Sequence, residues 1–386
     1  MDFQPTQDQQ GLIDGFQAVL APFDDAYWAE ADKTARFPHE FHAAMAAGGW
    51  LGIALPHDVG GAGLGVTEAA LMLLEVAKKA GMSGASAIHM NIFGPKAIDL
   101  FATPQQRQAW LPPLIQGTQK TCFAVTEPNT GLDTTQLQTR AVRQGDRYTL
   151  NGRKIWTSTA QVSEKMMILA RTAPYDDAAP THGLSLFYTD LDRNSVDVRR
   201  IDKMGRAAVD SNELFIDNLN VPASDLIGEE GQGFRYILQS LNPERILIAA
   251  EAVGIGLQAL DRATSYARDR QVFGRPIGQN QAIQHPLAAA WAKLQAARLL
   301  TLQAATLFDK GQPCGVEANA AKYLAAETAL DACRQAMATH GGMGYAREYH
   351  VERLFREIMI PYLAPVSQQL ALCYVAERGL GLPKSY

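Results

Sequence analysis

The chain has 386 residues, of which 47% are hydrophobic and 19% charged, as in ordered globular proteins of two or three domains. A net charge of −5 argues against a surface built to bind nucleic acid. We find no apolar run approaching the roughly 18 residues that span a bilayer and no targeting segment, and so expect a cytoplasmic protein with no membrane span.

Residues 1–118 show the helical period of apolar residues in several segments. We expect helices over Gly11 to Leu20, Phe37 to Gly48, Val66 to Ala80 and Pro104 to Ile115. The small, apolar stretch from Met82 to Asn91 either lines a pocket or packs in the core. This part therefore predicts an N-terminal α-helical domain.

Residues 119–228 change to short alternating runs, such as Cys122 to Val125 and Met166 to Ala170. Asn151-Gly152 is the kind of pair that forms a tight turn between two strands. The pattern predicts a middle antiparallel β domain. Residues 229–386 are again helical, so the fold class is α+β with a helical domain on either side of a β domain.

Two carboxylates interrupt the apolar stretch from Leu241 to Gly256. Asn242-Pro243 predicts a helix start, with a capping side chain followed by a proline in the first turn. Glu244 and Glu251 are two turns apart, so both lie on one face, about 10 Å apart. Glu244 is a candidate general base because apolar surroundings raise the pKa of a carboxyl group. A pairing with Arg245, or with the helix dipole, is the alternative.

The four cysteines are far apart in sequence, form no C-x-x-C pair and indicate reduced thiols. The histidines show no spacing typical of a metal site, so we expect no metal.

Four segments together resemble the signatures of the acyl-CoA dehydrogenase family of flavoproteins, in order and at similar spacing. They are Cys122 to Asp133, with T-E-P at its centre; Asn151 to Ser158; Arg268 to Ile277, followed by Asn280-Gln281; and His340 to Tyr345 with Val351 to Glu357. The resemblance covers essentially the whole chain. It implies FAD as cofactor, a C-terminal four-helix-bundle domain, an acyl-CoA substrate, electron-transfer flavoprotein as partner, and a homotetramer built as a dimer of dimers.

The resemblance also implies which residues bind FAD and substrate. Phe123, Val125 and Thr126 would present backbone amides and a hydroxyl to the isoalloxazine, Trp156 would pack against it, and Ser158 would lie near N5. The other implied FAD contacts are Gly131, Leu132, Thr157, Ser367 and Gln369. A neighbouring subunit would add Arg270, Phe273, Gln281, Gly341 and Gly342. Asn242 and Arg245 are the implied substrate-binding residues.

Most of the family has its base in a C-terminal E-G-T-S segment, where this chain has Pro365 by gapless alignment. A minority, including the isovaleryl-CoA and long-chain enzymes, has it at the position matching Glu244. We therefore expect Glu244 to be the base. Glu251 is interpreted as structural, paired with an arginine, although it could also shorten or polarise the acyl channel.

Two departures affect substrate binding. Proline has no N–H to hold the thioester carbonyl, so either the Val366 amide replaces it or the alignment is shifted by one residue. Leu132 stands where the family usually has serine, and Asn242 where aspartate is commoner. Both changes concern contacts around the CoA part of the substrate.

The expected reaction is α,β-dehydrogenation of a saturated acyl-CoA to the trans-2-enoyl-CoA. Alternatives are a flavin oxidase or monooxygenase, a dehydrogenase of carrier-protein thioesters, and a non-catalytic flavin-binding interaction protein. Acyl chain length, branching and the physiological direction of the reaction are open from sequence.

Overall fold

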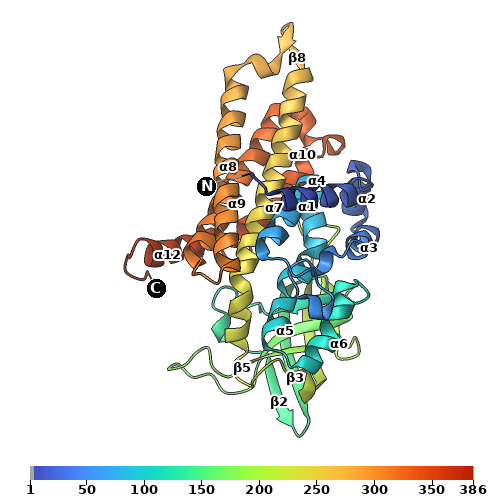
Figure 1. Ribbon diagram of the computed structural model, residues 1–386, viewed down its shortest axis with the longest axis vertical. Helices are drawn as coiled ribbons and strands as arrows, with labels where there is room; N and C mark the ends of the chain where they lie inside the picture. The colour runs from blue at the N-terminus through green and yellow to red at the C-terminus, as the bar shows by residue number, and fades with distance from the viewer. Residues whose placement is uncertain (1–3, 386) are drawn as a thin grey trace.

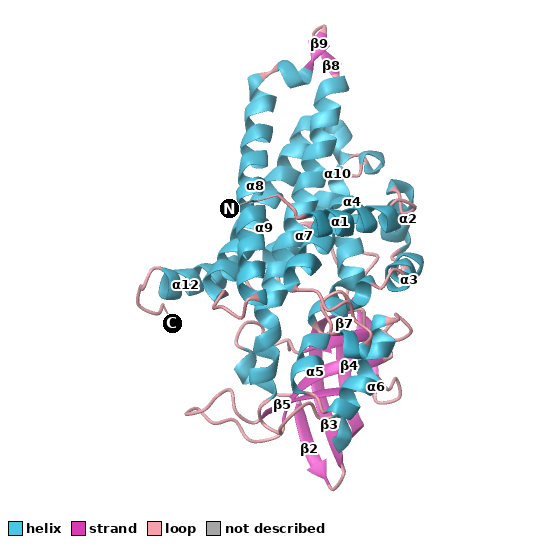
Figure 2. Ribbon diagram, in the orientation of Figure 1, coloured by secondary structure: helices cyan, strands magenta, loops and turns pink. Residues whose placement is uncertain are grey.

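The structure is a computed structural model that describes residues 4–385. A small β domain lies at one end of an elongated molecule, helices make up the rest, and a short hairpin marks the opposite end (Figures 1 and 2). The predicted order of helical, β and helical parts is confirmed.

The N-terminal part contains all four helices expected there. The helices are α1 (Gln7–Leu20), α2 (Asp25–Thr34), α3 (His39–Ala47), α4 (Val66–Phe93), α5 (Pro95–Phe101) and α6 (Pro104–Ile115). The stretch from Met82 to Asn91 is the second half of α4, and it is buried throughout. The stretch is therefore part of a core helix that crosses the interior.

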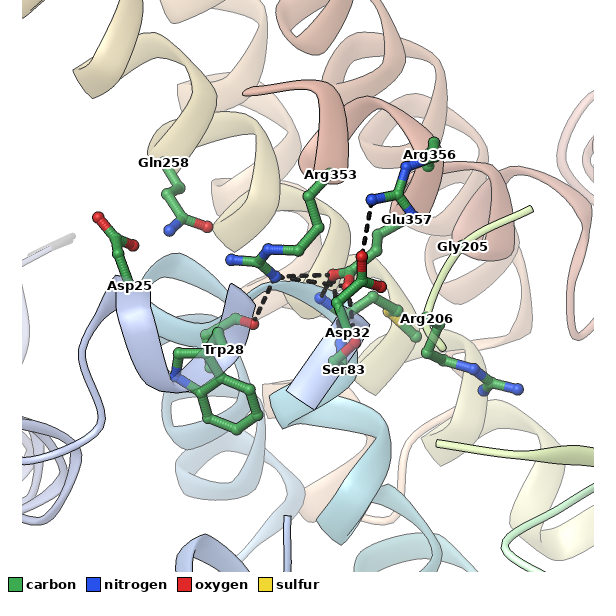
Figure 3. A network of polar contacts seen from close by, with 12 residues as sticks. Asp25, Trp28, Asp32, Ser83, Gly205, Arg206, Gln258, Arg353, Arg356 and Glu357 are labelled. Carbon is green, nitrogen blue, oxygen red and sulfur yellow. Dashed lines mark hydrogen bonds and ion pairs between the residues drawn. The ribbon is translucent and has the colours of Figure 1, made fainter. Parts of the chain in front are cut away.

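A kink at Gly81 divides α4, and the helix α10 (Val351–Glu357) fastens it (Figure 3). Glu357 accepts hydrogen bonds from Met82 N (2.7 Å), Ser83 N (3.2 Å) and Ser83 Oγ (2.6 Å). Arg353 donates to Ala80 O (3.1 Å) and pairs with Glu357. A Cβ on Gly81, whose φ is +72°, would lie 2.5 Å from the Glu357 carboxylate. The V-E-R-L-F-R-E segment thus holds the second half of α4 in place.

The β domain is one sheet with strand order β1-β4-β2-β3-β7-β6, and β5 pairs with β4. Its strands are β1 (Thr121–Ala124), β2 (Arg140–Gln144), β3 (Arg147–Ser158), β4 (Lys165–Arg171), β5 (Leu184–Asp190), β6 (Val196–Arg200) and β7 (Ser211–Pro222). The sheet is mixed rather than wholly antiparallel, because β4 pairs in parallel with β1 and β2. Long connections separate β4 from both partners in sequence, as parallel pairing requires.

The prediction of a turn at Asn151-Gly152 is wrong, because both residues lie inside β3. The register with β7 shifts between Leu150 and Gly152, so the pair marks a β-bulge. Gly152 is needed there because a Cβ would lie 2.7 Å from the Thr139 backbone.

Three long helices dominate the C-terminal part, and α7 packs along α4 and α9. The helices are α7 (Gly233–Asp269), α8 (Gln281–Asp309), α9 (Gly315–His340), α10, α11 (Met359–Leu363) and α12 (Gln368–Gly379), with a hairpin of β8 (Gln271–Val272) and β9 (Arg275–Pro276). The helix start predicted at Asn242-Pro243 is wrong, since α7 begins ten residues earlier and Pro243 lies inside it. Burial of the apolar face of α7 outweighs the one backbone hydrogen bond that proline cannot donate.

No single helix within residues 4–385 combines the length and apolarity needed to cross a membrane. The bent pair of Val351–Leu363 and Gln368–Gly379 meets the length and composition criteria together.

Candidate active site

Glu244 lies on α7, half-buried between that helix and its neighbours. Desolvation raises the pKa of its carboxyl group to about 6, although His89 and Arg245 act in the opposite direction and Glu251 adds to the rise. A carboxyl group with this pKa is ionised at neutral pH and still basic enough to take up a proton. The environment therefore suits the general base that the sequence predicts.

Glu251 pairs with His89 of α4, so the prediction that it pairs with an arginine is wrong. His89 Nδ1 lies 2.7 Å from Glu251 Oε1, and both residues are buried. Burial alone would lower the pKa of His89, but the Glu251 carboxylate outweighs that effect, so the pKa is raised. The raised pKa favours the protonated form of His89, and the contact connects α4 to α7.

Arg206 connects this interior to the sheet, and the sequence analysis missed it. The residue lies between β6 and β7 and is buried, and within residues 4–385 it has no acidic hydrogen-bond partner. Its guanidinium donates to Ser86 of α4 (3.3 Å), Ser158 of β3 (3.0 Å) and Ser211 of β7 (2.7 Å). In Figure 3 its side chain extends away from the cluster around Glu357. No local pattern distinguishes this arginine from the many exposed ones.

Two neighbouring segments of the β domain form a wall at the edge of the site. Phe123 lies in β1, and Val125 and Thr126 follow directly; Thr126 O accepts from Ile155 N of β3 at 2.9 Å. The backbone of Trp156 is left-handed (φ +60°) at an irregularity in the β3–β7 register, and its side chain is 57% exposed. Thr157 beside it is buried.

Glu127 and Lys154 form a buried ion pair that connects the two segments of this wall. Lys154 is fully buried, and its Nζ donates to Val125 O (3.0 Å) and Glu127 Oε1 (2.9 Å). Glu127 also accepts from Gln138 N and from the backbone and hydroxyl of Thr139. Burial lowers the pKa of Lys154 to about 8, and the Glu127 carboxylate opposes that fall. The two sequence motifs T-E-P and N-G-x-K-x-W therefore meet in one ion pair.

Three family models match the chain along its length. They describe the acyl-CoA dehydrogenase N-terminal domain (residues 6–118), middle domain (residues 122–219) and C-terminal domain (residues 231–376). The chain belongs to the acyl-CoA dehydrogenase family. It is therefore a flavin-dependent oxidoreductase, as the motifs predict.

Relatives within the family include reductases as well as dehydrogenases. The chain is 37% identical over 332 residues to a 3-(aryl)acrylate reductase of Clostridium sporogenes, covering 86% of this chain and 87% of that protein. It is 33% identical over 332 residues to the caffeyl-CoA reductase-Etf complex subunit CarC of Acetobacterium woodii, covering 86% and 87%. The solved butyryl-CoA dehydrogenase of Megasphaera elsdenii superposes with a TM-score of 0.93 at 30% identity, covering 98% of this chain and 100% of that chain.

Members of the acyl-CoA dehydrogenase family bind FAD, and the wall described above fits such a group. The large Trp156 indole is left open to solvent beside backbone of β1. The hydroxyl of Thr157 is buried, and no described residue forms a hydrogen bond with it. An exposed aromatic face next to an unpaired polar atom suits a planar ligand with polar edges. Gly131 and Leu132 lie in the exposed loop that follows the same wall.

Five further predicted FAD residues lie far from this wall. Arg270, Phe273, Gln281, Gly341 and Gly342 are at the hairpin end of the helical bundle, opposite the β domain (Figure 1). All five are exposed, Phe273 completely. One chain does not bring the two groups together, which is the arrangement expected if a neighbouring subunit supplies the second.

The other predicted residues lie at the start of α12 and next to Glu244. Ser367 caps α12 by accepting from Leu370 N (3.1 Å), and Gln369 is exposed. Arg245 donates to Asn242 Oδ1 (3.3 Å), so the structure brings the two predicted substrate-binding residues together.

Buried Lys322 holds the segment that contains Pro365. Its Nζ donates to Tyr362 O (3.2 Å), Val366 O (2.7 Å) and Gln368 Oε1 (2.8 Å). These bonds fix the backbone on both sides of the position where most family members have their base.

Replacing Lys154 with methionine is expected to loosen the FAD wall. Glu127 would keep its three other donors, so we expect a loss of about 2 kcal/mol in unfolding free energy together with reduced FAD content. Arg153→Met is the matched control, because Arg153 pairs with Glu213 at the surface and its side chain is 51% exposed. Urea unfolding and FAD absorbance measure both effects; equal losses in the two variants would contradict this role of Lys154.

The pKa of Glu244 predicts an acidic limb in the pH profile. Its pKa is raised to about 6, so the carboxylate becomes protonated as the pH falls through that value. We expect kcat/KM for oxidation of an acyl thioester to fall below pH 6 and to be roughly tenfold lower at pH 5. A profile that stays flat down to pH 5 would contradict an essential base with this pKa.

Proposed function

We propose that this enzyme dehydrogenates a saturated acyl-CoA thioester between its α- and β-carbons, with Glu244 as the general base. The observation that supports this most directly is the desolvated carboxylate of Glu244, with its pKa of about 6. At the C-terminal position where most of the family has its base, this chain has Pro365 instead of a carboxylate. Both features support assignment to the subgroup with its base on the earlier helix.

In this proposal one residue removes the proton and others position the cofactor and the substrate. The Glu244 carboxylate would accept the proton from the α-carbon as the enoyl double bond forms. β1 and Trp156 would hold FAD, which when bound would supply the acceptor for the hydride that leaves the β-carbon. Arg206 would keep the Ser158 hydroxyl in place, and Asn242 and Arg245 would orient the thioester.

The reverse reaction is the second candidate, because two of the named relatives are reductases. In that direction protonated Glu244 would return a proton to the α-carbon. At neutral pH the carboxylate is the major form of Glu244, and this is the form that removal of the α-proton requires.

Two further proposals concern partners. Electrons would pass to an electron-transfer flavoprotein, as the name of the CarC relative suggests for its own complex. A homotetramer built as a dimer of dimers would bring the exposed hairpin-end residues, Phe273 among them, to the FAD wall of a neighbouring subunit.

Anaerobic mixing of the FAD-loaded enzyme with straight and branched acyl-CoAs of increasing length tests the proposal. We expect at least one saturated acyl-CoA to bleach the flavin, and the best one defines the acyl group. In parallel, the reduced enzyme is mixed with the matching enoyl-CoAs and with 3-aryl acrylates. Reoxidation by an unsaturated compound, without bleaching by any saturated one, would assign the enzyme to the reductive direction. Rapid reoxidation by oxygen alone would indicate an oxidase.

A further inference from the structure

Arg206 is a buried cation with no acidic group in hydrogen-bond contact. The residue is 7% exposed, and its hydrogen bonds within residues 4–385 all go to serine hydroxyls. Its Nε is also buried and has no acceptor among the described residues. A purely structural contact between segments could use a neutral side chain, whereas burying a charge without a close partner costs stability. The retention of the charge therefore indicates a use for it.

The charge of Arg206 persists at neutral pH. Burial lowers the pKa of the guanidinium from its ordinary value of 12.5. Three carboxylates oppose that fall through their charge alone, those of Asp210, Glu251 and Glu357. A guanidinium stays protonated in proteins. Arg206 therefore adds a fixed positive charge to the interior.

Ser158 connects this charge to the FAD wall. Arg206 Nη2 lies 3.0 Å from Ser158 Oγ, and Ser158 follows Trp156 by two residues in β3. Ser158 is half-buried and Trp156 is 57% exposed, so protein does not seal this stretch of the wall. A ring atom that forms a hydrogen bond with Ser158 Oγ would lie within about 6 Å of the guanidinium. A buried charge acts strongly over this distance, because water screens it little.

Reduction of a flavin changes the charge beside this wall. In the proposed reaction the β-hydrogen leaves as a hydride, one proton with two electrons, while Glu244 takes the α-proton. The ring therefore carries one negative charge more after the transfer than before it. A fixed cation nearby favours the more negative form.

We infer that Arg206, acting through Ser158, raises the reduction potential of the bound flavin and so favours hydride transfer from the acyl chain. Arg206 is a positioning residue in this role, since Ser158 and not the guanidinium would contact the ring. The contacts to Ser86 and Ser211 fix the guanidinium behind Ser158. The inference rests on the proposed dehydrogenase function and adds to it a residue that sets the driving force of the transfer.

The midpoint potential of the FAD-loaded enzyme tests this role without any acyl-CoA. Slow anaerobic reduction by xanthine and xanthine oxidase with a reference dye gives the potential from the absorbance of flavin and dye. Arg206→Gln keeps hydrogen-bond donors but removes the charge. We expect the ratio of reduced to oxidised flavin at a given potential to fall at least about tenfold, which is about 30 mV for a two-electron couple. Arg206→Lys keeps the charge, and its ratio should stay within about twofold of wild type.

Two further variants separate the charge from folding. Arg193→Gln removes an exposed arginine of the same domain, which donates to Ala160 O and Ser163 O, and should leave the potential unchanged. Asp210→Asn removes a buried negative charge that acts on Arg206 and should raise the potential. This change of opposite sign does not depend on whether Arg206→Gln folds.

Each result decides the inference. Equal potentials in wild type and Arg206→Gln, or an equal fall in Arg206→Lys and Arg206→Gln, would overturn it and leave Arg206 with a structural role alone. If Arg206→Gln does not retain FAD, a higher potential in Asp210→Asn supports the inference, and an unchanged or lower one contradicts it. Failure of every acyl-CoA to reduce the flavin would overturn the proposed function instead, and the potentials would still decide the role of Arg206.

Discussion

Replacing Glu244 with glutamine is expected to lower kcat/KM for flavin reduction by about 10²- to 10⁴-fold, the usual contribution of a positioned base. Glutamine has the same shape and cannot accept a proton, so binding of acyl-CoA and FAD should persist. Anaerobic stopped-flow reduction of the flavin measures the loss. A spectral shift of the flavin on adding substrate confirms that the site is still occupied.

The same variant should be slightly more stable than wild type at neutral pH. The folded state raises the pKa of Glu244 from its ordinary value of 4.5 to about 6, so ionised Glu244 destabilises the fold above pH 6. A neutral side chain removes that penalty, and we expect a gain of about 1 kcal/mol. Wild-type turnover by Glu244→Gln would show that the base is elsewhere, with Glu251 the next carboxylate to test.

The second large effect is expected from Glu357→Ala, far from any reacting atom. This change would leave Arg353 as an unpaired buried charge and would remove the acceptor for Met82 N, Ser83 N and Ser83 Oγ. Breaking such a buried pair costs about 3–5 kcal/mol. The second half of α4 includes His89, so active-site geometry should be lost together with stability.

Glu352→Ala is the matched control on the same helix. Glu352 pairs with Arg356, which also has Asp32 as a partner, so its removal should cost about 1 kcal/mol or less. Urea denaturation of both variants at one protein concentration compares them. Similar midpoints would contradict the role assigned to Glu357 at the α4 kink.

Hydrophobic periodicity was sufficient to predict the order of helical and β parts, because each element buries one face against another. Local signals were less dependable. Pro243 does not begin a helix, since packing along α4 and α9 keeps α7 helical through it. Asn151-Gly152 does not form a turn, since the close approach of Thr139 requires a glycine within a strand.

The candidate site was predictable only where a motif marks it. The sequence pointed to the wall around Trp156 and to Glu244 as the candidate base, but two of the motifs also have a structural role. Glu127 and Lys154 form one buried pair, and Arg353 and Glu357 form another. These pairings depend on contacts between segments distant in sequence, which spacing along the chain does not reveal.

Arg206, His89 and the partner of Glu251 could not be predicted for the same reason. Nothing in the local sequence of Arg206 shows that three serines from α4, β3 and β7 surround it. His89 is one histidine among eight, in a stretch whose other residues are mostly small and apolar. Only the packing of α4 on α7 brings it to Glu251.

The most direct test of Glu244 as the base is solvent exchange at the α-carbon. The FAD-loaded wild type and Glu244→Gln would be incubated anaerobically in D₂O with the saturated acyl-CoA identified by flavin bleaching. Mass spectrometry of the recovered thioester then measures deuterium at the α-carbon. We predict incorporation with wild type and at least a hundredfold slower incorporation with the variant. Exchange at the wild-type rate in Glu244→Gln would contradict the account.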